Sequence, residues 1–359
     1  MKKSTRKLFL FRLCVAVAFT AYTCTVFMPI VTEKRKKDAD YPCVATEYSR
    51  AECVMELESR RILYESHGDI RLPMASTTKI ATAVTVLSLC EDVGAEFAIP
   101  KEAEGIEGSS VYLKGGDIYS VEDLLYGLML RSGNDCATAL ALYCCGNISA
   151  FASKMNETAQ KAGAIATNFR NPHGLPCAEH YTTARDLALI SCYALENPIF
   201  AKIVATKYYE PCRWKNKNKM LTCYDGAIGV KTGYTKEAGR CLVSAANRAD
   251  MVLVCAVLNC PTTYERSAVL LDDAFKAYEM VTLVDGKQVF EVGEGRALQK
   301  GVLGQDFRYP LMEGEQEWIE MKTNAVKKGT LSGDGREIIG NLEIYLAKRL
   351  LFSGNLYKL

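Results

Sequence analysis

The segment Arg71–Ala83 reads RLPMASTTKIATA, and the interpretation of the whole chain starts from it. The stretch from about Ser76 to Leu89 contains few helix-breaking residues, so we expect it to be a helix. Ser76 and Lys79 are three residues apart, and side chains at that spacing share one face of a helix. A serine hydroxyl needs an adjacent base to act as a nucleophile, and a lysine with a lowered pKa can be that base. The segment therefore predicts a nucleophile and its base at the entry to a helix.

Two more short strings follow in the chain and are candidates for the same site. Ser132-Gly133-Asn134 lies between two stretches that we expect to be helical, and Lys231-Thr232-Gly233 ends an extended run, AIGV. A strand edge can hold a peptide substrate by adding it as a further strand. Gly233 has no side chain where a substrate backbone would approach, while Lys231 and Thr232 offer a cation and a hydroxyl to a carboxylate. The lysine-containing string thus predicts a peptide-binding edge.

Each string alone has an ordinary structural explanation. A Ser-x-x-Lys string occurs about once by chance in a chain of this size, and Ser4-x-x-Lys7 is such a match in the basic N-terminal tail. Ser353-Gly354-Asn355 repeats the second string near the C-terminus. Taken singly, the three strings are explained as a helix-capping serine, a connecting turn and a surface turn. Their order, and their place in one expected domain, favour a shared site.

The three strings in this order resemble the Ser-x-x-Lys, Ser-x-Asn and Lys-Thr-Gly elements of penicillin-binding proteins and serine β-lactamases. The surrounding sequence is similar to one group among them, the low-molecular-weight penicillin-binding proteins, or D-alanyl-D-alanine carboxypeptidase family. The similar segments are EGSSVYLKGGDIYSVEDLLYGLMLRSGNDCATALA, NPHGLP, HYTTARDLA and GVKTGYTKEAGRCLVSAA. The resemblance covers about residues 44–280 strongly, and the tail more loosely through GNLEIYLAKRLLFSGNLY.

The resemblance implies a reaction and the residues that carry it out. The last D-alanine of a peptidoglycan stem pentapeptide is released through an acyl-enzyme, which water then hydrolyses. The implied catalytic residues are Ser76 as the acylated nucleophile, Lys79 as its general base and Ser132 as the proton relay to the leaving amine. β-Lactams would acylate the same serine and leave slowly. No metal and no organic cofactor is implied.

The resemblance also implies how the substrate is held. Asn134 binds the substrate amide, and Lys231 and Thr232 bind the carboxylate of the terminal D-alanine. Next to Gly233, the backbone N–H groups of the nucleophile and of Tyr234 form the oxyanion hole. Three other positions stay open between a structural and a functional role. They are His173 in a loop, Arg266 as a solvated charge or carboxylate ligand, and residues 215–219 as a basic edge or a contact for anionic wall polymers.

The expected architecture is α/β (α+β), with the β-lactamase/DD-peptidase-like fold. In that fold, helices and a helical subdomain flank an antiparallel sheet. We divide the chain into a signal peptide or membrane anchor at residues 1–37, a catalytic domain at 44–283 and a C-terminal β-rich domain at 284–359. In the last part, QVFEV, WIEM, EIIG, LEIYL and LLFSG read as short alternating strands separated by Gly, Asn and Asp.

Within the catalytic domain the sequence predicts several elements. Cys53–Ser59 and Ile62–Ser66 form a hairpin, and Val121–Ala194 is mostly helical, with a capping box between Thr183 and Asp186. Strands are expected at residues 227–230, 241–246 and 251–258, followed by a helix near 264–278.

The N-terminal run Leu13–Val31 contains 19 almost uncharged residues between basic flanks. At about 1.5 Å rise per residue, a helix of that length crosses a ~30 Å hydrocarbon core. The run is therefore a cleaved signal peptide or a retained anchor, and the absence of a clean small-x-small cleavage site favours the anchor. Both alternatives place the rest of the chain outside the cytoplasm, at the membrane face or in the cell wall.

Composition excludes several other classes. Hydrophobic residues make up 49% of the chain and charged residues 24%, so it is not a disordered protein. Of 44 basic and 42 acidic residues, residues 1–37 hold nine basic and one acidic, which leaves an acidic body of net charge −6. Nucleic-acid binding needs clustered Lys and Arg, so we exclude it.

The chain has fifteen cysteines, thirteen of them after residue 37. No Cys-x-x-Cys pair and no Cys/His cluster with zinc spacing occurs. Several cysteines lie in apolar runs, where the thiol behaves as a small buried hydrophobic group. We therefore expect mainly free buried thiols, with a disulfide framework and metal binding as the alternatives.

Competing functions share parts of this pattern. A DD-endopeptidase or transpeptidase uses the same acyl-enzyme and differs in the bond cleaved or in the acceptor. A β-lactamase needs a carboxylate to drive deacylation, and no convincing one occurs at the expected spacing. A non-catalytic scaffold that binds penicillin or the cell wall would not need intact motif residues. The carboxypeptidase is the leading prediction.

Overall fold

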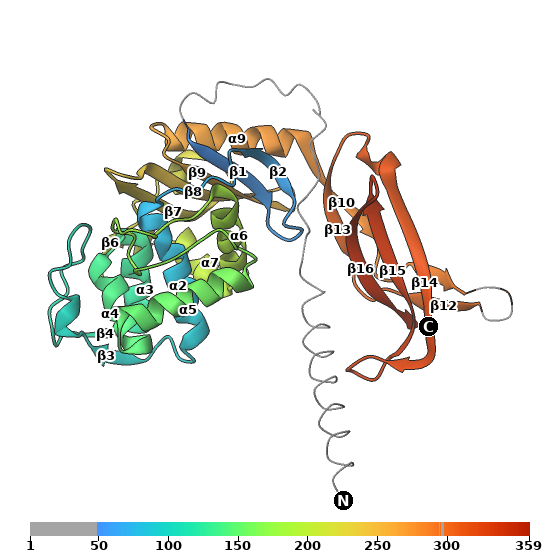
Figure 1. The fold of residues 1–359 in the computed structure, drawn as a ribbon, viewed down its shortest axis with the longest axis horizontal. Coiled ribbons are helices and arrows are strands. Elements are labelled where there is room, and N and C mark those ends of the chain that lie inside the picture. Colours follow the sequence, from blue (N-terminus) through green and yellow to red (C-terminus); the bar gives the residue numbers. More distant parts are fainter. Residues whose placement is uncertain (1–48, 294, 296–297) are drawn as a thin grey trace, which may run out of the picture. The chain divides into compact units, whose positions relative to one another are not determined.

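The computed structural model describes residues 49–293, 295 and 298–359. Its first part is built on a five-stranded antiparallel sheet with strand order β2-β1-β9-β8-β7 (Figure 1). The strands are β1 (Ala51–Glu56), β2 (Ile62–Ser66), β7 (Ala227–Thr235), β8 (Gly239–Arg248) and β9 (Met251–Leu258). The predicted hairpin near the start of the chain and the three later strands are therefore confirmed, and the hairpin joins the late strands through β1 and β9.

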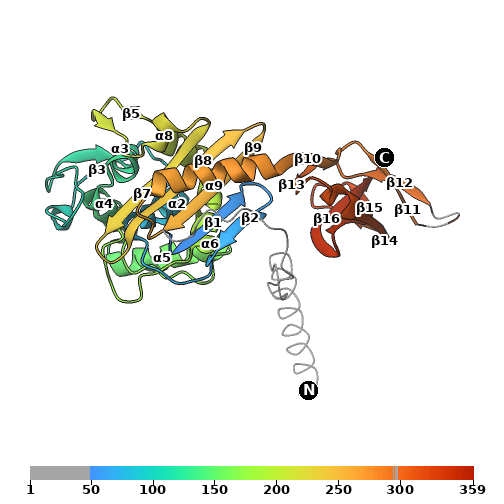
Figure 2. The same cartoon turned by 90° about the horizontal axis from the view of Figure 1, so that it is seen from above.

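Helices cover both faces of this sheet (Figure 2). The helices of this part are α2 (Lys79–Leu89), α3 (Val121–Tyr126), α4 (Asn134–Cys145), α5 (Ile148–Lys161), α6 (Ala184–Leu195), α7 (Pro198–Ala205), α8 (Met220–Cys223) and α9 (Thr263–Ala277), of which α3 and α4 pack mainly on other helices. A π-helical turn at Gly127–Arg131 links α3 toward α4. Short sheets pair β3 (Glu96–Ala98) with β4 (Ile118–Ser120) and β5 (Tyr208–Tyr209) with β6 (Trp214–Lys215).

Strand β9 explains why the run MVLVCAVL has no polar alternation. Val254 and Ala256 belong to the hydrophobic core that the sheet shares with α2, α4, α6 and α7. Cys255 and Val257 belong to a second core, together with Leu271 of α9. Because successive side chains of a strand point to opposite faces, a strand covered on both faces is apolar at every position. The continuous run is thus the signature of a sheet between two helical layers.

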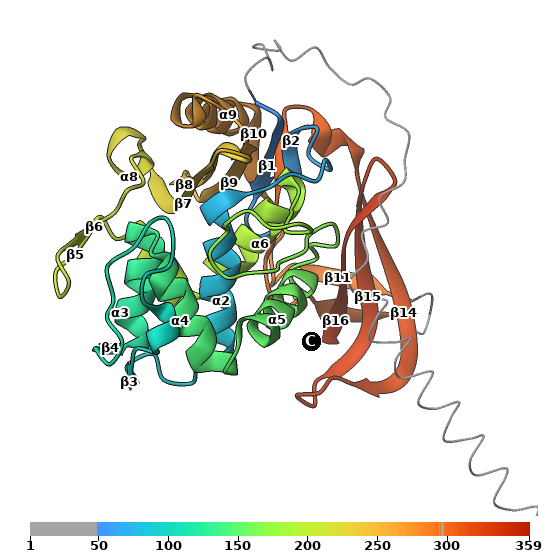
Figure 3. The same ribbon diagram turned by 60° about the vertical axis from the view of Figure 1, so that its left-hand side comes forward.

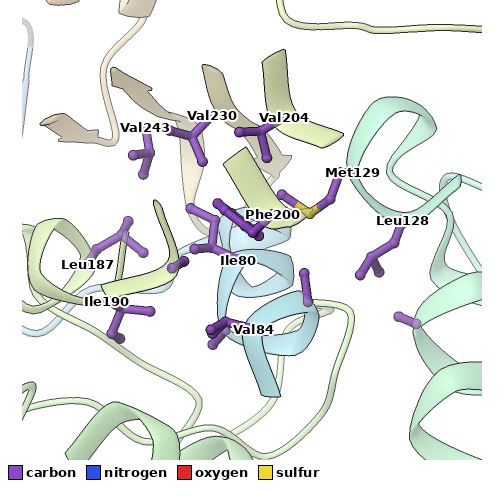
Figure 4. Close-up of a cluster of buried hydrophobic side chains, with 14 of the residues drawn as sticks. Ile80, Val84, Leu128, Met129, Leu187, Ile190, Phe200, Val204, Val230 and Val243 are labelled. Carbon is purple, nitrogen blue, oxygen red and sulfur yellow. The ribbon is translucent and has the colours of Figure 1, made fainter. Parts of the chain in front are cut away.

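Helix α2 is the central element of the helical layer, packed against α4, α5 and α6 (Figure 3). Figure 4 shows Ile80 and Val84 of this helix beside Ile190 of α6 and Phe200 of α7. The cluster also includes Val230 of β7, so the first turns of α2 are fixed against the sheet edge. This packing holds the helix that begins immediately after the predicted nucleophile.

The predicted capping box of α6 is confirmed for Thr183 and wrong for Asp186. Thr183 is the N-cap of α6, and its hydroxyl accepts the backbone N–H of Asp186. The Asp186 carboxylate does not close the predicted capping box but accepts from Ala166 N at 2.7 Å and Thr167 Oγ1 at 2.8 Å. The capping box forms instead at α3, between Ser120 and Asp123.

The C-terminal part is all β, as predicted. β10 (Tyr278–Val284) pairs with β13 (Phe307–Met312), and a second sheet has the order β11-β12-β16-β15-β14. Its strands are β11 (Val289–Val292), β12 (Gln299–Val302), β14 (Ile319–Leu331), β15 (Glu337–Leu346) and β16 (Arg349–Lys358). EIIG and LEIYL are wrong as separate strands, because both belong to β15 and pairing with β14 continues through Gly340 and Asn341. A domain boundary near residue 284 stays a prediction.

The predicted membrane segment lies outside the described residues. Within the described ranges, no single helix has the length and apolar character needed to cross a membrane. Two bent helix pairs, α4 with α5 and α6 with α7, meet the criterion only jointly.

Candidate active site

The turn that carries Ser76 is a 3₁₀ helix, Ala75–Thr78, and α2 begins directly after it at Lys79. Ala75 has φ of 50°, a conformation that residues with a side chain rarely adopt. Gly174 lies against this turn, and a Cβ atom added to it would be 2.0 Å from the Ala75 carbonyl oxygen. The turn Ala75–Thr78, named the nucleophile turn after the predicted role of Ser76, is therefore held in an unusual shape by a close backbone contact that requires glycine.

Lys79 is buried completely and points its amine at three acceptors. Lys79 Nζ lies 3.1 Å from Ser76 Oγ, 2.6 Å from Asn134 Oδ1 and 2.6 Å from the carbonyl oxygen of His173. Burial, and next the positive charge of Lys231, lower the pKa of Lys79 well below its usual value. A lower pKa favours the neutral amine, the form that can accept the Ser76 proton.

The second predicted string joins the helical layer to this amine. Ser132 adopts a left-handed conformation with φ of 64° at the end of the π turn, and Asn134 is the first residue of α4. The Asn134 side-chain amide donates to the Glu107 carbonyl oxygen at 2.6 Å, which leaves its oxygen for Lys79. Ser132 is buried, and among the described residues no hydrogen bond connects its hydroxyl to Ser76 or Lys79.

The third string lies on β7, which is an outer strand of the five-stranded sheet. A Cβ atom added to Gly233 would be 3.0 Å from Ser76 N, so glycine lets the strand approach the nucleophile turn closely. Lys231 is buried and donates to the Thr232 carbonyl oxygen at 2.9 Å. Burial, and then the charge of Lys217, lower the pKa of Lys231 to about 7. Tyr234 is exposed just beyond Gly233.

Sequence reasoning missed Asp135, which organises the loop beside Asn134. Its buried carboxylate accepts from Ser110 Oγ at 2.5 Å, Val111 N at 3.0 Å and Leu113 N at 3.2 Å. Loop and helix are also joined by the Asn134 N–H, which donates to Ser109 O at 2.7 Å. The only sequence signal was the position of an acid at the start of a helix, and it did not identify the loop that this acid binds.

Three positions left open by the sequence now have defined contacts. His173 contributes its backbone carbonyl to Lys79 rather than its ring. Arg266 forms a bidentate ion pair with buried Glu52, at 2.6 and 2.7 Å, so its guanidinium has a structural partner. Lys217, from the basic stretch, reaches to 3.4 Å from Ser109 Oγ and adds positive charge near Lys231.

The described residues hold no group of three or more His, Cys, Asp or Glu side chains able to bind a metal. The cysteines in the same ranges are free thiols, and six of them are buried: Cys53, Cys136, Cys192, Cys241, Cys255 and Cys260. Cys90 Sγ and Cys144 Sγ lie 3.6 Å apart and share a thiol hydrogen bond, and both remain free thiols.

A serine and a buried lysine at the start of α2, an asparagine at the start of α4 and a Lys-Thr-Gly edge strand together define a serine acyl-transferase site of the penicillin-binding class. A family model described as D-alanyl-D-alanine carboxypeptidase matches residues 37–262. The chain therefore belongs to the D-alanyl-D-alanine carboxypeptidase family, and it is a serine-type carboxypeptidase that acts outside the cytoplasm in cell-wall metabolism.

Relatives support this membership along most of the chain. The carboxypeptidase DacF of Bacillus subtilis is 28% identical over 304 residues, which are 80% of this chain and 74% of that protein. DacA of Haemophilus influenzae is 30% identical over 325 residues, 81% of this chain and 83% of that protein. Among solved structures, penicillin binding protein 5 from Haemophilus influenzae superposes with a TM-score of 0.72 at 27% identity, covering 87% of this chain and 96% of that chain.

Proposed function

We propose that Ser76, with Lys79 as its base, cleaves the terminal D-Ala-D-Ala bond of a peptidoglycan stem pentapeptide. The observation that carries this assignment is the 3.1 Å contact between Ser76 Oγ and the fully buried amine of Lys79. A buried cation is costly unless it is stabilised, and a second cation, Lys231, raises that cost. Lys79 is therefore neutral in the resting site, and a neutral amine is the form that can accept the serine proton.

In the first step, Ser76 Oγ attacks the carbonyl carbon of the penultimate D-alanine and its proton passes to Lys79. The negative charge that develops on the carbonyl oxygen is stabilised by the backbone N–H groups of Ser76 and Tyr234. The close approach of Gly233 to Ser76 N supports this assignment, because it brings the edge strand to the nucleophile.

The substrate is held as an additional strand along β7. The terminal carboxylate binds the Lys231 ammonium and the Thr232 hydroxyl, and Asn134 holds the substrate amide. The C–N bond then breaks, and the leaving D-alanine amine receives a proton through Ser132. The left-handed turn at Ser132 supports this role by placing the serine between the π turn and the start of α4.

Water next hydrolyses the Ser76 ester and restores the free hydroxyl, so the reaction consumes one water and releases one D-alanine. A β-lactam carries a strained amide and a carboxylate in the same relation as the substrate. It would acylate Ser76 by the same first step.

The finer localisation is also a proposal. We infer that Leu13–Val31 tethers the chain to the outer face of the membrane, since this run is long enough to span it and basic residues flank it. Separating membranes from soluble protein tests it: the full chain is expected in the membrane fraction. A soluble mature chain that begins after residue 31 would show cleavage instead.

Release of D-alanine from a stem pentapeptide, measured with the full chain and with its Ser76→Ala variant, tests the proposed reaction. We expect release from the unsubstituted chain alone. An assay with an added amine acceptor separates hydrolysis from transpeptidation, because a transpeptidase would convert the acyl group into a new amide. Folded protein that releases no D-alanine in either assay would contradict the proposal.

A further inference from the structure

The loop of residues 168–182 lies against the nucleophile turn at several points. Leu72 and Thr182 exchange backbone hydrogen bonds of 2.8 and 3.0 Å, just before the turn. The same loop supplies the His173 carbonyl to Lys79 and the Gly174 backbone to Ala75. One further contact uses a side chain, that of His180.

His180 is buried and makes a hydrogen bond through each ring nitrogen. Its Nδ1 accepts the Arg170 backbone N–H at 3.0 Å, and its Nε2 lies 2.9 Å from Thr78 Oγ1. The Phe169 ring contacts the imidazole edge-on, with ring centroids 5.8 Å apart. Both sides of the ring therefore have a defined partner in the protein.

These contacts fix the tautomer. A neutral imidazole has one N–H group, and Nδ1 is already an acceptor, so the proton is on Nε2. Thr78 Oγ1 donates its own proton to the Ala75 carbonyl oxygen at 2.8 Å. The Thr78 hydroxyl must then accept from His180 Nε2. Burial lowers the pKa of His180 to about 4, which keeps the ring neutral at ordinary pH.

A directed chain of hydrogen bonds results. It runs from the Arg170 N–H through the His180 ring and the Thr78 hydroxyl to the Ala75 carbonyl. Ala75 precedes the nucleophile, and Thr78 precedes the base, so the chain ends on both flanks of the Ser76–Lys79 pair. The positive φ of Ala75 is the backbone feature that this chain restrains.

We propose that His180 is a positioning residue for acylation, donating through Nε2 to Thr78 so that the nucleophile turn keeps Ser76 Oγ within reach of Lys79 Nζ. This inference rests on the proposed roles of Ser76 and Lys79. A buried histidine that only fills space would contribute to folding but not to the geometry of attack. The two cases differ in which replacement restores the rate.

Two amide replacements of His180 each keep only one of the ring's two hydrogen bonds. In His180→Asn the amide oxygen can still accept at the position of Nδ1, but the donor to Thr78 is lost. In His180→Gln the amide nitrogen can still donate at the position of Nε2. His67→Asn is the matched control, because His67 is exposed and lies outside this chain of contacts.

The measurement is acylation of the full-length protein by a fluorescent penicillin over a concentration series, which separates the binding constant from the acylation rate constant. We expect His180→Asn to lower the acylation rate constant by about 10²-fold, the scale of a small misplacement of reacting groups, with binding little changed. His180→Gln should recover most of the rate, and His67→Asn should match the unsubstituted protein. Equal rates for all variants, or equal loss in the Asn and Gln variants, would overturn the proposal.

A second pair covers the case in which a His180 variant does not fold. Thr78→Val removes the hydroxyl, whereas Thr78→Ser keeps it. We expect slow acylation only in the valine variant, and equal rates in both would overturn the proposal. Peptide mapping of the labelled unsubstituted protein distinguishes the two levels of failure: no label on Ser76 removes the proposed function, whereas label on Ser76 with unaffected variants removes only the role of His180.

Discussion

Strand β9 in the catalytic part and strand β14 in the C-terminal part are opposite kinds of strand. β9 is buried at almost every position between two helical layers, whereas the described side chains of β14 are almost all exposed. The difference in burial shows which part of the molecule can lower the pKa of an amine. A charged amine has its pKa lowered by burial only where surrounding elements exclude water, and the catalytic part provides that environment for Lys79.

Replacing one lysine in each part should produce the largest difference between the catalytic and the C-terminal part. Lys79→Gln removes the proposed base, and we expect acylation by penicillin to fall by about 10²–10⁴-fold. Lys322→Gln on β14, a lysine whose side chain is 58% exposed, should leave the rate unchanged. Stopped-flow fluorescence with a reporter penicillin gives both rates. Similar rates for the two variants would show that Lys79 is not the base.

Removing one aromatic side chain from each part measures the packing difference. Phe200 is 0% exposed in the core beside α2, whereas Trp318 is 57% exposed. Phe200→Ala should lower the free energy of unfolding by about 3–5 kcal/mol, because a cavity remains in a tightly packed core. Trp318→Ala should change it by less than about 0.5 kcal/mol. Urea unfolding followed by circular dichroism tests this, and equal losses would contradict the comparison.

Two ion pairs extend the comparison to charge. Arg266→Ala leaves the Glu52 carboxylate buried without its partner, and we expect a loss of about 3–5 kcal/mol. Lys358→Ala breaks a pair with Glu337 whose side chains are 49% and 31% exposed, and water replaces it at a cost of about 0–1 kcal/mol. Chemical denaturation of both variants measures the difference. A larger loss in the Lys358 variant would reverse this conclusion.

The smallest expected effect concerns pH. The pKa of Lys231 is lowered to about 7, so its ammonium form is present below that pH and lost above it. In the proposed function the ammonium binds the substrate carboxylate, so we expect KM for a stem peptide to rise as pH increases through about 7. A bound carboxylate raises the pKa and moves this rise upward. Lys231→Arg stays charged and should flatten the rise. A KM that increases equally in both proteins would assign the titration to another group.

Much of the site could be predicted because its motif residues are local in sequence. Ser76 and Lys79 are close on one turn, and the Lys-Thr-Gly string is part of one strand, so spacing alone indicates which side chains can meet. The apolar run of β9 was equally readable, because a strand buried on both faces has no polar alternation.

The remaining features depend on contacts between distant residues. The His180–Thr78 bond joins residues 102 positions apart, and the Asp135 contacts with its loop span more than twenty. The Asp186 carboxylate accepts hydrogen bonds from a preceding loop instead of from the N-cap residue of its own helix. In β15, Gly340-Asn341 looked like a break, but pairing with β14 and β16 keeps it extended. These contacts join residues that are neighbours only in the folded structure, and local sequence propensities carry no information about them.

The pairing of β1 with β9 has a consequence for when the protein can fold during its synthesis. These neighbouring strands are about as far apart in sequence as the catalytic part allows, and β7, against which the nucleophile turn lies, is also a late segment. Contacts between distant segments close large loops, which makes folding slow. During synthesis, Ser76 is made long before strands β7, β8 and β9, which complete the proposed site. We therefore expect the chain to lack peptidase activity until β9 has been made and has paired with β1, so that its production and its action are separated in time.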